Sequence, residues 1–118
     1  MSWRIFHNPK CGTSRKVLAA LQEAGKEPEV VEYLKTPPDA AELTALLARM
    51  GVGPRALLRR KGTPYDELGL DDPKWSDAEL IAFMAAHPIL IERPVVDTGT
   101  TARLCRPVER LQELLEKA

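Results

Sequence analysis

Apolar residues along the first third of the 118-residue chain follow a strand–helix–strand pattern. A short apolar run over residues 3–6 predicts a first strand, and residues 29–34 predict a second. Between them, apolar residues at helical spacing predict a helix over residues 13–24 that ends at Gly25. This order implies a parallel pair of strands joined by a right-handed crossover.

The middle of the chain, residues 36–87, is predicted to be mainly helical and to separate two halves of a sheet. Thr36-Pro37 is expected to begin one helix, which Gly51 ends. A short helix is expected over residues 55–60. Ser76-Asp77-Ala78-Glu79 has the pattern of a capping box and predicts the start of a further helix.

The last third of the chain predicts the second half of the sheet and a final helix. Residues 88–91 and 94–96 are interpreted as a strand edge and a strand, and Leu104-Cys105 as a further short strand. Pro107 is expected to begin the last helix. Without a repeat or a low-complexity segment, residues 1–118 are predicted to form a single α/β domain.

Composition narrows the range of partners. With 17 basic and 17 acidic side chains, the chain has no net charge to attract nucleic acid or an anionic membrane. No apolar run approaches about 18 residues and no secretory leader is recognised, so we expect a cytoplasmic protein. One compact domain is expected to be a monomer. Two cysteines and two histidines, widely separated, predict neither a disulfide framework nor a metal site. No tightly bound cofactor is expected.

Cys11 has the clearest chemical setting, because it lies where the first strand turns into the first helix. The start of a helix presents unpaired backbone N–H groups and a partial positive charge. Both favour a thiolate and a bound oxyanion, and Gly12 lets the backbone approach the group that the sulfur attacks. The alternative is an inert cysteine, since free cysteines are usually buried.

Three arginines lie at predicted element boundaries, where side chains from different elements converge: Arg59, Arg93 and Arg106. Arg93 precedes Pro94, so its backbone is expected to be extended or joined to a cis proline. Their guanidinium groups are candidates for holding an anion. The alternative is that each is a solvated surface residue, and spacing alone does not separate the two interpretations.

Six stretches of the chain, in order and at matching spacing, are similar to one known family. They are His7 to Arg15, Tyr33 to Pro38, Met50-Gly51 with Arg55 to Arg59, Pro64 to Leu70, His87 to Pro94, and Arg103 to Pro107. They cover nearly the whole chain and resemble the glutaredoxin-linked arsenate reductases. The resemblance implies a thioredoxin-like mixed sheet flanked by helices, with an inserted helical subdomain over about residues 36–87.

The resemblance also implies roles for individual residues. The reactive cysteine falls on Cys11, while His7 matches a histidine that helps to keep the thiol reactive and Ser14 a serine near the sulfur. The alternative for His7 is a residue that only caps the end of the strand.

The oxyanion-binding arginines of the family fall on Arg59, Arg93 and Arg106, whereas the neighbouring Arg60 does not match. Cys105 is interpreted as structural. The loop over residues 97–102 departs from the family pattern and leads into Arg106.

The same resemblance implies a reaction in which the Cys11 thiolate attacks arsenate while the arginines neutralise the oxyanion. Glutathione, as a cosubstrate, then attacks the adduct, glutaredoxin reduces the mixed product, and arsenite is released. Because Cys11-Gly12-Thr13-Ser14 is a monothiol version of a dithiol motif, an external thiol is expected to resolve the intermediate.

Two other functions are compatible with the same residues. Relatives on this scaffold bind RNA polymerase and sense redox state, which would make Cys11 a sensor and residues 51–54 a contact surface. The other alternative is a thiol oxidoreductase that acts on a different substrate.

Overall fold

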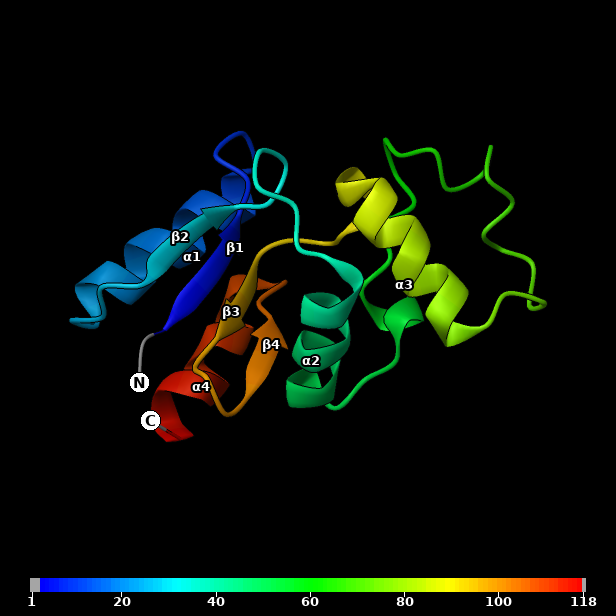
Figure 1. Ribbon diagram of the computed structural model, residues 1–118. Coiled ribbons are helices and arrows are strands. Elements are labelled where there is room, and N and C mark those ends of the chain that lie inside the picture. Colours follow the sequence, from blue (N-terminus) through cyan, green and yellow to red (C-terminus); the bar gives the residue numbers. More distant parts are fainter. Residues whose placement is uncertain (1–2, 118) are drawn as a thin grey trace.

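The computed structural model describes residues 3–117 and shows a mixed sheet with helices against both faces (Figure 1). The described strands lie in the order β2-β1-β3-β4, with β1 parallel to β2 and antiparallel to β3. Their bounds are Arg4–His7 for β1, Glu29–Glu32 for β2, Val95–Asp97 for β3 and Ala102–Leu104 for β4. The predicted α/β fold, with its parallel first pair, is confirmed.

The helical elements of the described chain alternate with these strands and fill the segment between β2 and β3. The α-helices are α1 (Gly12–Glu23), α2 (Ala40–Met50), α3 (Asp77–Ala86) and α4 (Leu111–Lys117). Three 3-10 turns are η1 (Pro54–Ala56), η2 (Pro88–Leu90) and η3 (Val108–Arg110). That residues 36–87 are an insertion into one domain stays a prediction.

Alternate residues of the sheet face two apolar cores. On one face, Ile5 and Val96 pack with the buried sides of α1 and α4. On the other face, Phe6 and Val95 join the apolar sides of α2 and α3. Successive strand residues point to opposite faces, so neighbouring residues of β1 and β3 serve both cores.

The strand register brings several chain segments to one edge of the sheet. Phe6 of β1 lies opposite Val95 of β3, and Val95 lies opposite Leu104 of β4. The residues that follow β1, precede β3 and follow β4 therefore meet at the same edge. Because β1 and β2 are parallel, the residues that follow β2 reach this edge as well.

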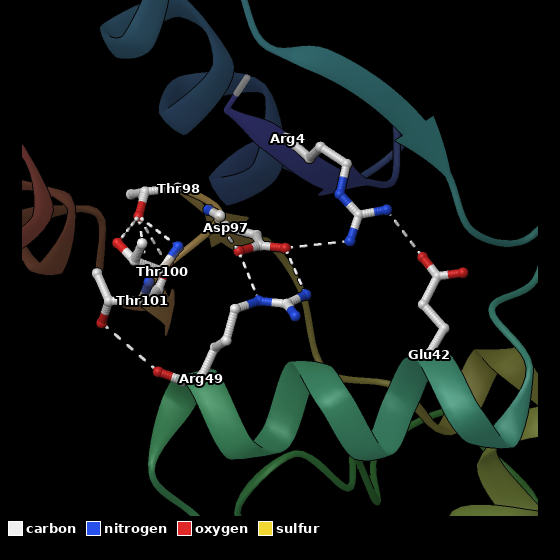
Figure 2. A network of polar contacts seen from close by, with 8 residues as sticks. Arg4, Glu42, Arg49, Asp97, Thr98, Thr100 and Thr101 are labelled. Carbon is white, nitrogen blue, oxygen red and sulfur yellow. Dashed lines mark hydrogen bonds and ion pairs between the residues drawn. The ribbon is translucent and has the colours of Figure 1, made fainter. Parts of the chain in front are cut away.

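A buried carboxylate fastens α2 to the sheet (Figure 2). Asp97, at the end of β3, accepts hydrogen bonds from Arg49 of α2 at 3.0 and 2.7 Å and from Arg4 of β1 at 3.0 Å. Its other contact is the Gly99 backbone N–H, at 2.9 Å. Burial alone raises the pKa of the Asp97 carboxyl, but the bonds from Arg49, Gly99 and Arg4 bring it below its ordinary value.

Capping side chains fix where α2 and α3 begin. The predicted start of α3 is confirmed, and that of α2 is wrong. Ser76 and Glu79 form the predicted capping box at the start of α3. By contrast, α2 does not begin at Thr36-Pro37, because its N-cap is Asp39, whose side chain accepts from the Glu42 N–H. Pro38 explains the delay, since a residue that precedes proline is disfavoured in the helical conformation.

Three further boundaries differ from expectation. Residues 88–90 form the turn η2 rather than a strand edge, with N–H bonds from Leu90 to His87 and from Ile91 to Pro88. Only Ile91 pairs as a strand residue does, in an isolated antiparallel bridge with Leu58. The short helix expected over residues 55–60 is reduced to η1. The last helix does not begin as an α-helix at Pro107, since η3 precedes α4.

Candidate active site

Cys11 sits at the carboxyl end of β1 and is the N-cap residue of α1, with φ −93° and ψ 122°. Its N–H donates to the Asn8 carbonyl at 3.0 Å, and its own carbonyl accepts from the Arg15 N–H at 3.0 Å. The side chain is partly exposed rather than sealed in a core. The thiol is therefore held at a helix start, within reach of solvent.

A backbone N–H group and two arginine side chains act on the Cys11 sulfur. Burial alone would raise the pKa of the Cys11 thiol, but the backbone N–H of Ser14 and the side chains of Arg93 and Arg106 outweigh it and lower the pKa below its ordinary value. Arg106 donates from Nη1 to the sulfur at 3.8 Å. The arrangement favours a thiolate, the form of cysteine that attacks electrophiles.

Arg93 approaches Cys11 from the start of β3, and Arg106 approaches it from the end of the neighbouring strand β4. Arg93 lies just before β3 and Arg106 just after β4, and each is joined to the following proline by a cis peptide bond. Arg106 Nη1 also donates to the Arg93 carbonyl at 3.5 Å. The structure thus brings together three of the predicted site residues, which lie up to 95 positions apart in the chain.

Arg59 is placed differently from the other two arginines. Its Nη1 donates to Glu92 at 2.8 Å and its Nε to the Lys61 carbonyl at 3.0 Å. Glu92 also accepts from the Arg93 N–H at 3.3 Å, so Arg59 is held beside Arg93 through a shared carboxylate. No direct contact between Arg59 and Cys11 is found among the described residues. Arg60 lies on the surface and pairs with Asp66.

His7 and Ser14 contact each other rather than the sulfur through their side chains. His7 Nδ1 lies 2.6 Å from the Ser14 hydroxyl, which also accepts from the Asn8 N–H at 3.1 Å. Burial is the main cause that lowers the pKa of His7, with the nearby Glu32 acting in the opposite sense. A neutral imidazole is therefore expected at pH 7, and Ser14 reaches the Cys11 sulfur through its backbone N–H.

Tyr33 is a neighbour of this site that sequence reasoning did not single out. It follows β2, is fully buried, and lies close enough to Arg93 and Asn8 for both to lower the pKa of its hydroxyl, which burial raises overall. The sequence offered one indication of this, which is the position of Tyr33 at the end of the second predicted strand. A tyrosine directly after the strand parallel to β1 ends at the same edge as Cys11.

Cys105 has the opposite character to Cys11. It is fully buried, and burial together with the charge of Glu113 raises the pKa of its thiol to about 12. This thiol stays protonated at neutral pH, which agrees with a structural role.

Within residues 3–117, no three histidine, cysteine or acidic side chains gather in a way that could hold a metal ion. None of the helices described there is long and apolar enough to cross a membrane.

A groove of about 430 Å³ adjoins the loop that carries Cys11. Its walls include His7 and Lys10 on the loop side and Leu34, Lys35 and Ile89 on the other side. Leu34 and Ile89 are both exposed, at 42% and 41%. The groove therefore combines apolar surface with Lys10 and with an ion pair between Lys35 and Glu32 at 3.5 Å, beside the loop that carries the candidate nucleophile.

Comparison with known proteins identifies the family. The model of the ArsC family matches residues 6–114. An arsenate reductase of Rhizobium meliloti is 54% identical over 98% of this chain and 82% of its own length. One from Neisseria meningitidis is 42% identical over 95% of this chain and 97% of its own.

A solved structure agrees with the sequence comparisons. An arsenate reductase from Vibrio cholerae superposes with a TM-score of 0.91 at 46% identity, covering 96% of this chain and 97% of that one. The thioredoxin-like fold that the resemblance implied is confirmed. From the family model, the relatives that match nearly the whole of this chain and the shared fold, we conclude that this chain belongs to the ArsC family.

Proposed function

We propose that the protein reduces arsenate to arsenite, with the Cys11 thiolate as the nucleophile. The observation that carries the proposal is the pairing of Cys11 with Arg93 and Arg106, which lower the pKa of its thiol. The same guanidinium groups suit a tetrahedral oxyanion, because arginine donates planar pairs of charge-assisted hydrogen bonds. Relatives named arsenate reductase at about half identity over nearly the full chain support the choice of arsenate.

The first step forms a sulfur–arsenic bond. The thiolate attacks arsenic, an arsenic–oxygen bond breaks, and the oxygen leaves as hydroxide that takes up a proton to become water. Arg93 and Arg106 stabilise the negative charge that is shared between the attacking sulfur and the departing oxygen. Backbone N–H groups at the start of α1 face the same region and add to this stabilisation.

Arg59 is proposed as the third oxyanion-binding arginine. It lies beside Arg93, and its Nη1 forms an ion pair with Glu92 Oε1 at 2.8 Å. An arriving oxyanion competes with this carboxylate for the guanidinium. We propose that Arg59 then contributes to binding when the site is filled.

The electrons are proposed to come from two thiols. Glutathione attacks the Cys11–arsenic adduct, and the two sulfurs together supply the two electrons that convert arsenic(V) to arsenic(III). The Cys11 sulfur–arsenic bond breaks with its electron pair going to arsenic, which leaves as arsenite, and the two sulfurs end as a mixed disulfide that glutaredoxin reduces. An external thiol is required because Cys105, the second of the two cysteines of the chain, is buried with its thiol pKa at about 12.

The surroundings of the site suit small charged thiols. Lys10 and Lys35 flank the groove beside the Cys11 loop and would meet the two carboxylates of glutathione, Lys35 in competition with its ion pair to Glu32 at 3.5 Å. Both cysteines are free thiols, which fits a reducing compartment such as the cytoplasm. We propose that the protein works there as a monomer, with glutaredoxin as a transient partner.

The test is a coupled assay that follows NADPH oxidation with arsenate, glutathione, glutaredoxin and glutathione reductase. Wild-type protein is expected to turn over, and Cys11→Ser is expected to fall to the background rate. Cys105→Ser serves as the matched control and should retain activity when it folds. Replacing glutathione and glutaredoxin by thioredoxin and its reductase tests the reductant. Turnover by Cys11→Ser would contradict the proposal.

A further inference from the structure

Two polar atoms near Cys11 are buried without a hydrogen-bond partner. They are the hydroxyl oxygen of Tyr33 and Nε of Arg93. No other buried side-chain nitrogen or oxygen within residues 3–117 shares this condition. Buried polar groups are nearly always satisfied in proteins, so two unpaired atoms in one site call for an explanation.

The two atoms belong to neighbouring side chains. The charge of Arg93 is felt at the Tyr33 hydroxyl, as is that of Cys11. The Asn8 side chain also approaches this hydroxyl and lowers its pKa, but without a hydrogen bond of normal geometry. Since Asn8 Oδ1 accepts from the Lys10 N–H at 3.0 Å, its amide NH2 is the group left for Tyr33.

The unpaired atoms are chemically complementary. Arginine Nε carries a hydrogen and acts only as a donor, whereas a tyrosine oxygen also accepts. A single hydrogen bond from Arg93 Nε to the Tyr33 oxygen would satisfy both. It would also leave the terminal nitrogens of Arg93 free to face Cys11, whose thiol pKa this side chain lowers.

From this complementarity, and resting on the proposed function, we infer that Tyr33 is a positioning residue for Arg93. An oxyanion that binds against Cys11 draws the guanidinium into a position where its Nε–H meets the Tyr33 hydroxyl. The free protein leaves both atoms unpaired, and the filled site pairs them. The hydrogen bond therefore favours the anion-bound state over the free state, which is the condition for a contact to strengthen binding.

The test compares wild type with Tyr33→Phe, which removes only the hydroxyl. The Michaelis constant for arsenate is expected to rise about tenfold, the effect of losing one hydrogen bond to a charged group. The rise in melting temperature caused by arsenate should shrink in parallel. The melting temperature of the free variant should stay equal or increase, because an unpaired buried hydroxyl has been removed. The pKa of the Cys11 thiol in the free protein should not change.

Tyr65→Phe is the matched control. Its hydroxyl lies 3.5 Å from Asp71, away from Cys11, and its loss should leave the Michaelis constant unchanged. A Tyr33→Phe protein with a lower melting temperature and an unaltered Michaelis constant would show a merely structural tyrosine and overturn the inference. A wild-type protein that neither reduces arsenate nor is stabilised by it would instead overturn the proposed function on which the inference rests.

Discussion

Arg106 directs Nη1 at the sulfur of Cys11 from 3.8 Å, although the two residues are 95 positions apart. Cys11 follows β1 and Arg106 follows β4, and the antiparallel pairing of β3 with both strands brings these ends together. The sheet thus brings a charged partner to a cysteine at a helix start, which favours its thiolate form. The chemistry depends on strand register as much as on the Cys11 motif.

Arg59 and Arg60 offer a direct comparison of neighbouring arginines. Arg59→Ala is expected to raise the Michaelis constant for arsenate about tenfold, because one charge-assisted contact to the oxyanion is lost. Arg60→Ala should leave it unchanged, since Arg60 pairs with Asp66 on the surface. Steady-state kinetics at constant ionic strength checks both. Equal effects of the two variants would remove Arg59 from the oxyanion site.

His7 is expected to act through Ser14. His7→Ala should lower the free energy of unfolding by about 1–2 kcal/mol, because a buried hydrogen bond to the Ser14 hydroxyl is lost. Ser14→Ala should cost a similar amount, and the double variant less than the sum, which urea unfolding would reveal. The Cys11 thiol pKa should move less in His7→Ala than in Arg106→Ala. A larger shift in His7→Ala would show that the imidazole acts on the sulfur directly.

Asp97 is expected to make stability depend on pH. Its carboxyl has a lower pKa in the folded protein than in the unfolded chain, so the stabilisation is present above the unfolded value and is lost as the pH falls through the folded value. Asp97→Asn should lower the free energy of unfolding by about 2 kcal/mol at pH 7, since Arg4 and Arg49 lose their shared partner.

The Asp97 prediction is checked by urea unfolding between pH 3 and pH 7. The difference between wild type and Asp97→Asn should shrink toward the acid end of this range. A constant difference would mean that the ion pairs with Arg4 and Arg49 contribute little.

Local signals in the sequence predicted the elements that depend on local chemistry. The capping box at Ser76 and the strand–helix–strand order around Cys11 are both confirmed. The strand edge predicted for residues 88–91 was wrong for residues 88–90, because a short apolar run has the same pattern in a strand and in a 3-10 turn. The pairing of Arg59 with Glu92 joins residues 33 positions apart and leaves no periodic trace in the chain.

Some residues of the candidate site could likewise be predicted from local sequence, and others could not. Cys11 could be singled out from its turn alone. The boundary positions of Arg93 and Arg106 made them candidates only, because arginines at such positions are common, and the resemblance separated them from surface residues. Tyr33 shows what sequence reasoning misses. Its unpaired hydroxyl becomes visible only when the ends of β1, β2 and β3 are placed side by side.

The central claim is that arginines hold the Cys11 sulfur as a thiolate that meets the oxyanion. The most direct measurement is the pH dependence of Cys11 alkylation by iodoacetamide, with and without arsenate, in wild type and Arg106→Ala. We predict a thiol pKa below the ordinary cysteine value in wild type, a higher pKa in Arg106→Ala, and slower alkylation of wild type when arsenate is present. A wild-type pKa at or above the ordinary value, or one that Arg106→Ala leaves unchanged, would contradict the account.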